Sequence, residues 1–297
     1  METLKKFETP ALIVALVLAA LDGFFWFGIF FTPGPPGAHE YFLDVGQGDS
    51  ELMIFGNGAR IMIDAGPDGS VVGALAGVLG GEDRSIDLAV VSHPEADHFG
   101  GYQYLLDGGY RFGAFIYNGR GAAPEEKAWA RFVAALDRKH IPLVTLGAPG
   151  AIRSGTDKID VLSPGRTLAG SAATNDTALV LRAEIGGVRT LLTADVGAGI
   201  EAYLLDIYRG SGALRADILK VGHHGSKYSS GESFLRAVAP RLAVIEVGEG
   251  NSYGHPAKET LGRLDSFTAA AIVRTDEKGT IAVSFADGEM KATAGKP

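Results

Sequence analysis

The sequence predicts an α/β fold, and three observations lead to that prediction. Short apolar runs typical of strands alternate with segments of helical periodicity between residues 41 and 285. Polar His and Asp residues follow directly after several of the strand-like runs. The 297 residues are 46% hydrophobic, which suits one large core in a domain of α/β type. Periodicity alone does not distinguish α/β from α+β.

The first expected element is a membrane-spanning helix at residues 11–31. This run of 21 residues carries one charge, Asp22, and a helix needs ~20 apolar residues to cross the hydrocarbon core. Thirteen Leu, Ile, Phe and Val side chains contribute roughly −4 to −8 kcal/mol to insertion, against about +3 kcal/mol for a central Asp. The run therefore predicts an anchor, and a buried core helix is the alternative.

The charges around this run predict its orientation. Lys5 and Lys6 precede it, and no Lys or Arg follows before Arg60, so the positive-inside bias places the N-terminus in the cytoplasm and the remaining chain outside. We expect residues 1–38 to form the anchor and a Pro/Gly linker. Residues 39–297 then form one extracytoplasmic domain.

The remaining elements follow from periodicity and turn signals. Residues 41–45, 51–55 and 60–64 alternate at period two between Gly-rich turns, which predicts an antiparallel opening. Gly186 and Gly187 join two strand-like runs and predict a hairpin. Further strands are expected at 86–91, 111–117, 158–163, 177–185, 188–194, 217–221, 242–247, 271–274 and 279–285. Helices are expected at 71–79, 125–139, 199–208, 231–239 and 257–264, and residues 292–297 read as a tail.

The segment after the strand at 86–91 is typical of a metal site. Residues 92–101 read SHPEADHFGG, and the side chains of His93, Glu95, Asp97 and His98 can converge on one or two cations from a loop that ends in a Gly-Gly turn. Imidazole and carboxylate ligands together suit zinc or manganese. Taken alone, the same residues also fit a solvated polar loop.

Three further clusters of polar residues follow strands in the same way. Asp195 ends the run 190–194, where a strand terminus would project a carboxylate into a cleft. The pair His223-His224 follows 217–221 and precedes Ser226. A Gly-rich turn after 242–247 carries Tyr253 and His255. Each is weak evidence alone, and together they favour a metal-dependent site.

At these residues the chain resembles the metallo-β-lactamase fold superfamily, and within it the hydrolase domain of ComEC-type DNA-uptake proteins. The resemblance covers about residues 40–285, in seven ordered blocks at 42–50, 63–66, 93–101, 175–181, 191–195, 219–226 and 253–256. It implies a four-layer αβ/βα sandwich of two mixed sheets with helices outside. Glu95 departs from the pattern, because His is commonest there. Asn175 departs too, because many relatives have a His ligand in that region.

The resemblance also implies a ligand set for one or two divalent metals. Asp97, His98 and one of His223 or His224 would hold one metal, and we prefer His223 because it comes first after the strand. Asp195 would bridge to a second metal held by His93 and Glu95, where Asn175 or Asp176 are the other nearby donors. Such an oxygen-rich site favours manganese or magnesium over zinc relative to a three-His site. Asp64 is expected to orient a ligating histidine.

Composition limits the substrate. A net charge of −8 gives no global basic footprint for nucleic acid, so any grip on DNA requires a local strip, for which Lys220, Lys227 and Arg182 are the candidates. The chain has no Cys, which excludes disulfides, thiolate zinc sites and Cys nucleophiles.

The leading functional hypothesis is a membrane-anchored, extracytoplasmic phosphodiesterase or nuclease related to competence DNA uptake. Asp97, His255 and Lys227 are the candidate catalytic residues, and Ser226 and Tyr253 the candidate substrate contacts. The substrate would be a phosphodiester, with single-stranded DNA as one candidate. Two alternatives stay open: an envelope phosphodiesterase, lactonase or β-lactamase-type hydrolase, and a non-catalytic docking subunit of DNA uptake.

Overall fold

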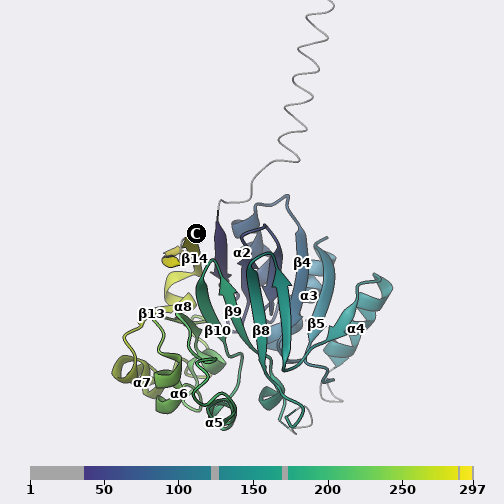
Figure 1. The fold of residues 1–297 in the computed structure, drawn as a ribbon. Coiled ribbons are helices and arrows are strands. Elements are labelled where there is room, and N and C mark those ends of the chain that lie inside the picture. Colours follow the sequence, from purple (N-terminus) through teal and green to yellow (C-terminus); the bar gives the residue numbers. More distant parts are fainter. Residues whose placement is uncertain (1–36, 122–126, 169–172, 287, 296–297) are drawn as a thin grey trace, which may run out of the picture. The chain divides into compact units, whose positions relative to one another are not determined.

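The computed structural model describes residues 37–121, 127–168, 173–286 and 288–295, and its strands form two sheets (Figure 1). Sheet 1 has the order β15 (Glu289–Gly295), β14 (Thr280–Ala286), β1 (Ala38–Phe42), β2 (Glu51–Ile54), β3 (Arg60–Ile63), β4 (Ser85–Val91), β5 (Arg111–Tyr117) and β6 (Leu143–Thr145). Sheet 2 has the order β13 (Ala271–Arg274), β12 (Leu242–Ile245), β11 (Ile218–Lys220), β10 (Val188–Leu192), β9 (Val180–Ile185), β8 (Asp157–Ser163) and β7 (Gly150–Ser154).

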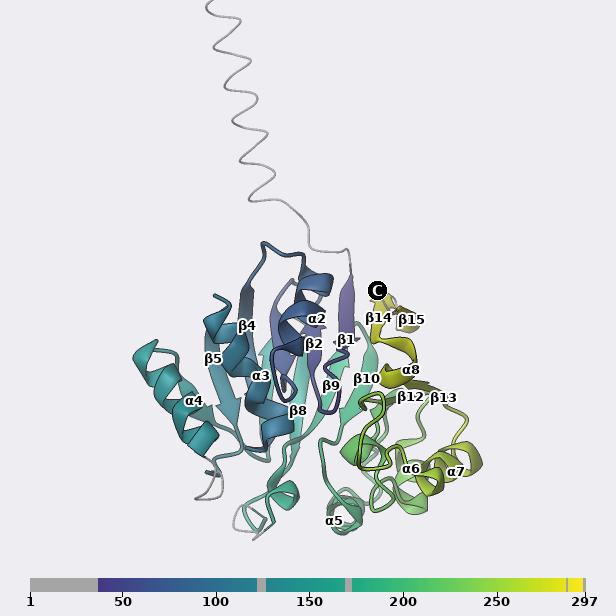
Figure 2. The ribbon, with the colours of Figure 1, turned by 180° about the vertical axis from the view of Figure 1, so that it is seen from behind.

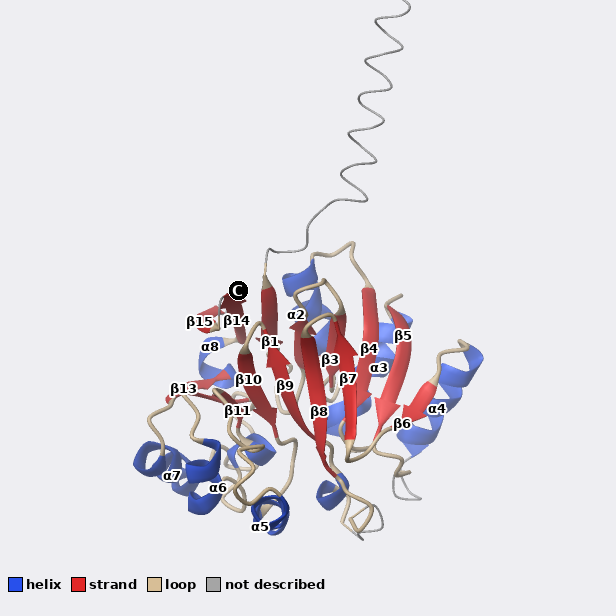
Figure 3. Cartoon of the chain, in the orientation of Figure 1, coloured by secondary structure: helices blue, strands red, loops and turns tan. Residues whose placement is uncertain are grey.

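Helices lie on the outer side of each sheet, and those beside sheet 2 gather near β10 to β13 (Figures 2 and 3). Sheet 1 packs against α2 (Ser70–Leu79), α3 (Ala96–Asp107) and α4 (Lys127–Arg138). Sheet 2 packs against α5 (Ala198–Ile207), α6 (Glu232–Val238) and α7 (Lys258–Phe267). The short segments are η1 (Asn175–Thr177), η2 (Gly222–Gly225) and α8 (Thr275–Lys278). The expected αβ/βα sandwich of two mixed sheets is confirmed.

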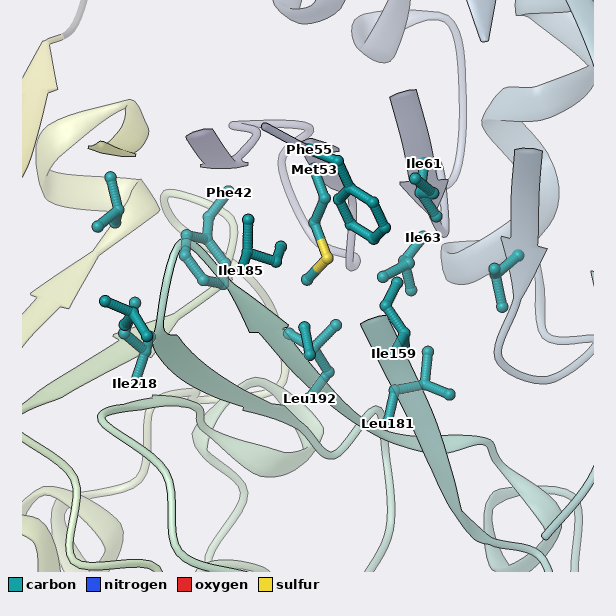
Figure 4. Packing of buried hydrophobic residues seen from close by; sticks show 14 of the residues in the cluster. Phe42, Met53, Phe55, Ile61, Ile63, Ile159, Leu181, Ile185, Leu192 and Ile218 are labelled. Atoms are coloured by element: carbon teal, nitrogen blue, oxygen red, sulfur yellow. The ribbon is translucent and has the colours of Figure 1, made fainter. Parts of the chain in front are cut away.

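The central core lies between the two sheets (Figure 4). Phe42, Met53 and Ile61 of sheet 1 share one buried cluster with Ile159 and Leu181 of sheet 2. The inward side chains alternate with outward ones along β1, as the period-two pattern predicts. Burial of these apolar side chains between the sheets is the main contribution to the stability of the sandwich.

The strand pairings agree with the predicted opening and hairpin. β1, β2 and β3 pair antiparallel. Gly186 and Gly187 connect the antiparallel strands β9 and β10 with φ of 56° and 83°, a backbone conformation that glycine adopts without strain.

The Gly-Gly turn expected at the end of the metal motif is wrong, because Gly100 and Gly101 lie inside α3. A Cβ on Gly101 would lie 1.9 Å from the carbonyl oxygen of Ala65, and one on Gly100 would lie 2.3 Å from that of Pro67. These glycines therefore let α3 pack closely against the loop after β3. The expected tail was also wrong up to Gly295, because β15 pairs with β14 there. The elements β6, β7 and α8 had no sequence signal that we recognised.

The expected anchor at residues 11–31 and the linker as far as residue 36 lie outside the described residues, and Ala38, the last residue of the expected linker, begins β1. Within the part of the chain that the structure describes, no helix has the length and apolarity required to cross a membrane.

One acidic residue lies within the central core. Glu40 occupies β1 between Ala38 and Phe42, is 0% exposed, and accepts a 2.6 Å hydrogen bond from Thr190 Oγ1 across the sheets. Burial raises the pKa of Glu40 from 4.5 to about 8. The folded state therefore keeps a proton that the unfolded chain releases, so stability falls as pH rises from the ordinary value towards the raised one.

The substitution Glu40→Gln should remove the contribution of Glu40 to the pH dependence of stability, because the Gln amide is neutral at every pH in this range. We compare the free energy of unfolding of the variant with that of the unchanged chain. The difference, variant minus unchanged chain, should rise by up to about 1.4 kcal/mol for each pH unit between about pH 5 and pH 8. Urea unfolding at one-unit pH intervals measures the difference. The control is Glu82→Gln, at an exposed position. Its free energy of unfolding should stay within about 0.5 kcal/mol of that of the unchanged chain at every pH tested. A flat difference for Glu40→Gln would contradict the assignment.

Candidate metal centre

The polar clusters of the sequence converge where parallel strands of both sheets end. β3 pairs parallel with β4, and Asp64 and His93 follow these strands. β10 and β11 are also parallel neighbours, and they lead into Asp195 and His224. Parallel strands end at the same edge of a sheet. The polar residues that follow these apolar strands therefore lie together at that edge, as in other open α/β sheets.

Four side chains form a compact set, which we call the donor group: Asp97, His98, Asp195 and His224. One ligand atom from each lies within 4.8 Å of all the others. His98 Nε2 lies 3.4 Å from Asp195 Oδ1, and His224 Nε2 lies 3.5 Å from Asp97 Oδ2. Ligands bound tetrahedrally to zinc at about 2.1 Å are separated by about 3.4 Å. The spacing therefore suits a single cation.

The donor group also contains polar atoms that lack partners. Within the described residues, the buried Nε2 atoms of His98 and His224 and Oδ1 of Asp195 accept or donate no hydrogen bond. Buried polar atoms in folded proteins are nearly always satisfied. A divalent cation would satisfy all three atoms at once, so these residues fit the metal that the fold implies.

Both histidines of the donor group are oriented by acceptors behind them. His98 Nδ1 lies 2.8 Å from Asp64 Oδ2, and Asp64 also accepts a 2.8 Å bond from the backbone N–H of Ser92. His224 Nδ1 lies 3.0 Å from the carbonyl oxygen of Glu246. A hydrogen bond at Nδ1 fixes the tautomer that leaves Nε2 free to bind metal. Asp64 thus lies where an orienting residue is expected.

Backbone strain is concentrated at the same strand ends. Asp64, Ala194, His223 and His224 all have positive φ, between 44° and 54°. Residues other than glycine adopt this region only where the surrounding structure holds them there, and such residues cluster at functional sites.

The charged side chains of the donor group shift one another's pKa values. Burial alone would lower the pKa of His224, but Asp195 and Asp49 outweigh it and raise this pKa to about 10. Burial acts to raise the pKa of Asp195, but His224 and His98 hold it well below its usual range. Without a metal, protons thus balance the buried carboxylates. A bound cation displaces such protons, so its affinity increases with pH.

A buried ion pair lies beneath the donor group. Lys220 is 0% exposed, and its Nζ donates to the carboxylate of Asp49 and to the carbonyl oxygen of Ala194. The side chains of Glu51 and Glu246 lie close to Asp49, and both are buried. Sequence reasoning missed this cluster, since Lys220 ends an apolar strand and reads as a surface charge.

The second expected metal position is less complete. His93 Nε2 is buried and without a hydrogen-bond partner among the described residues, and it lies 3.8 Å from Glu95 Oε2. Neither residue belongs to a cluster of three or more His, Asp and Glu donors in the described part of the chain. Asn175 and Asp176 begin η1, ahead of β9. This position therefore offers one imidazole and one carboxylate in close proximity.

The donor group opens into a cleft of about 470 Å³. Its rim includes His223, Tyr253 and His255. The ring of His255 lies 5.9 Å from that of His223 and is stacked with Tyr253 at 6.1 Å. Gln47 and Glu95 also line this cleft.

Some candidate residues lie elsewhere than expected. His224, rather than the preferred His223, belongs to the donor group, and His223 is half-exposed with Nε2 3.5 Å from Asp195 Oδ2. Lys227 is exposed and, like the buried Ser226, lines a neighbouring depression. Neither lines the cleft.

The expected basic strip of Lys220, Lys227 and Arg182 is wrong in two of its three members. Lys220 is fully buried in its ion pair. Arg182 donates to Asp160 Oδ2 and to the carbonyl oxygen of Ala213 on sheet 2. Lys227 is the member that stays exposed.

The chain is similar in sequence to two bacterial proteins, one of which is named a competence protein. It is 29% identical over 198 residues to ComE operon protein 3 of Bacillus subtilis (strain 168), covering 67% of this chain and 24% of that protein. It is 29% identical over 262 residues to Competence protein ComA of Neisseria gonorrhoeae, covering 84% of this chain and 32% of that protein. The chain thus spans between a quarter and a third of the length of these relatives.

Among solved structures, the fold is similar to that of CmlA, a diiron beta-hydroxylase from Streptomyces venezuelae, with a TM-score of 0.53 and 11% identity over 85% of this chain and 55% of that one. At this identity the likeness concerns the fold alone. The family model of the metallo-beta-lactamase superfamily matches residues 43–248, a span that contains every member of the donor group. The chain belongs to the metallo-β-lactamase superfamily.

Proposed function

We propose that this chain is a membrane-anchored, extracytoplasmic, metal-dependent phosphodiesterase that acts on nucleic acid. The observation that carries the proposal is the donor group, whose unpartnered buried atoms point to a cation beside an open cleft. One relative is named Competence protein ComA and another ComE operon protein 3, and these names support a role in competence, the uptake of DNA.

The donor group would hold one divalent cation, and His93 with Glu95 would hold a second one. Asp195 would be the ligand that the two positions share in this proposal, since its carboxylate has two oxygen atoms that can accept. The cations would be zinc or manganese, and the carboxylate at Glu95 favours manganese at the second position. A bound divalent cation supplies hydroxide at neutral pH by lowering the pKa of water to about 7.

The chain's own residues would bind and orient the substrate. The Asp97 side chain is about one-third exposed. Its carboxylate therefore contacts the cleft on one side and His224 on the other. His255 and His223 stand at the open side with their rings 5.9 Å apart. In this proposal they would donate hydrogen bonds to a phosphoryl oxygen and give a proton to the leaving alcohol. Lys227 lies farther out, so we assign it to substrate binding.

We also propose the membrane attachment and the domain boundary. Residues 1–38 would form the anchor and linker, and residues 39–297 the hydrolase domain outside the cytoplasm. The supporting features are the apolar run at 11–31 and the positive charges of Lys5 and Lys6 before it.

Removing a member of the donor group should abolish metal binding and hydrolysis together. Because each loses a direct ligand, Asp195→Ala and His224→Ala should weaken metal affinity by more than the 10- to 100-fold typical of outer residues. Elemental analysis gives the metal content. Turnover of bis-p-nitrophenyl phosphate, single-stranded DNA and nitrocefin in parallel gives the activity, and we expect hydrolysis of the two phosphodiesters only.

The adjacent His223→Ala is the matched control for metal content. It should keep the metal at the donor group, because its ring lies outside that group, while its rate falls. If His223→Ala lost metal and His224→Ala kept it, the ligand assignment would be wrong. Hydrolysis of nitrocefin without any phosphodiester turnover would favour a β-lactamase-type hydrolase instead.

The orientation of the anchor can be tested with a reporter. Alkaline phosphatase fused after residue 297 should be active, because that enzyme folds only outside the cytoplasm. Replacing Lys5→Asp and Lys6→Asp together should lower this activity, because the positive-inside bias is lost. High fluorescence of a cytoplasmic reporter fused at the same place would contradict the proposed topology.

A further inference from the structure

Two tyrosines beside the cleft are unusually exposed. Among the described residues, large hydrophobic side chains are exposed at five positions, and the two most exposed are Tyr253 at 70% and Tyr228 at 69%. Tyr253 lines both the cleft and a neighbouring depression of about 570 Å³, and Tyr228 lines that depression too. An exposed aromatic pair next to an open site is typical of a binding surface.

The rings connect the donor group with this surface. His223 lies 3.5 Å from Asp195, the His255 ring lies 5.9 Å from that of His223, and Tyr253 is nearly parallel to His255 at 19°. Beyond Tyr253, the same depression reaches Tyr228. A series of imidazole and phenol rings therefore runs outward from the cleft.

Positive charge accompanies the aromatic rings. Lys227 Nζ lies 5.1 Å from the centroid of the Tyr228 ring. Lys258 lines the same depression, and both lysines are exposed. The combination of aromatic faces with nearby lysines matches a polymer that has flat rings along an anionic backbone.

Both loops that carry the tyrosines are fixed from behind. Arg263 donates to the carbonyl oxygens of Lys227, Ser229 and Ser230 at 3.0, 2.7 and 2.9 Å. The side chain of Asn251 accepts from the backbone N–H of Tyr253 and donates to the carbonyl oxygen of His255 at 3.2 and 2.7 Å. Loops held in this way lose little entropy on binding.

We propose that Tyr228 and Tyr253, with Lys227 and Lys258, form a stacking platform for the unpaired bases of a single-stranded nucleic acid whose phosphodiester enters the cleft. This inference rests on the proposed function and names its substrate class. Bases of a duplex stack on each other and leave no face for the tyrosines. With a net charge of −8 the chain offers only local basic side chains to the phosphates, so stacking would supply affinity beyond that of the two lysines.

The platform predicts a tyrosine-dependent affinity with a shallow salt dependence. The test uses the full, metal-loaded chain and a fluorescent phosphorothioate oligothymidylate, which resists cleavage. Because each stacked base contributes about 5- to 100-fold in affinity, Tyr228→Ala and Tyr253→Ala should each weaken binding by at least about 5-fold, and Tyr228→Phe should not. Two lysines on phosphates give a slope of about −1.4 in log affinity against log salt.

Tyr104→Ala is the matched control, because Tyr104 is half-exposed on α3, about two turns from Ala96 at the start of that helix. It should bind the oligonucleotide like the unchanged chain. A blunt duplex of the same chemistry should bind at least about 10-fold more weakly, and neither alanine variant should change that binding.

The outcomes separate this inference from the proposed function. Tyrosine-dependent binding without phosphodiester turnover would support the platform and contradict the proposed function. Turnover of bis-p-nitrophenyl phosphate with oligonucleotide binding that is absent, or unchanged in both alanine variants, would overturn the platform. Equal affinity for the duplex and the single strand would also overturn it.

Discussion

The geometry of the donor group depends on the buried ion pair between Lys220 and Asp49. Lys220 ends β11 in sheet 2, and Asp49 lies in the loop between β1 and β2 of sheet 1, so their contact joins the two sheets beneath the site. The ammonium also donates to the carbonyl oxygen of Ala194, the residue before Asp195. Removing one partner from such a buried pair typically costs about 3–5 kcal/mol, because the other charge stays desolvated.

The same pair controls the charge around the metal ligands. Asp49 lies 3.2 Å from His224 Nδ1 and 3.7 Å from His98 Nδ1, so its carboxylate supports both imidazoles from behind. Burial, with help from Asp49, raises the pKa of the neighbouring Glu246 to about 8. The raised pKa values of Glu246 and its neighbour Glu51 favour their neutral forms, so the ammonium of Lys220 is left to compensate Asp49.

Periodicity predicted an α/β or α+β fold, and the resemblance to the metallo-β-lactamase superfamily implied the sandwich. The strand ends that carry polar side chains were predictable, because a strand terminus followed by His or Asp is a local pattern, as at Asp195. It did not separate His223 from His224, because both have left-handed backbone and only the packing around η2 decides which ring turns inward. The burial of Lys220 depends on a partner 171 positions away. Gly101 resembles a turn signal, yet it serves close helix packing that no local pattern reveals.

The central claim is that Asp97, His98, Asp195 and His224 hold a divalent cation. The most direct measurement is anomalous X-ray scattering from crystals of the chain grown with manganese or zinc. The account predicts a peak about 2.0–2.2 Å from Nε2 of both histidines and from a carboxylate oxygen of each aspartate. A peak at His223 and His255 with none inside the donor group would contradict it.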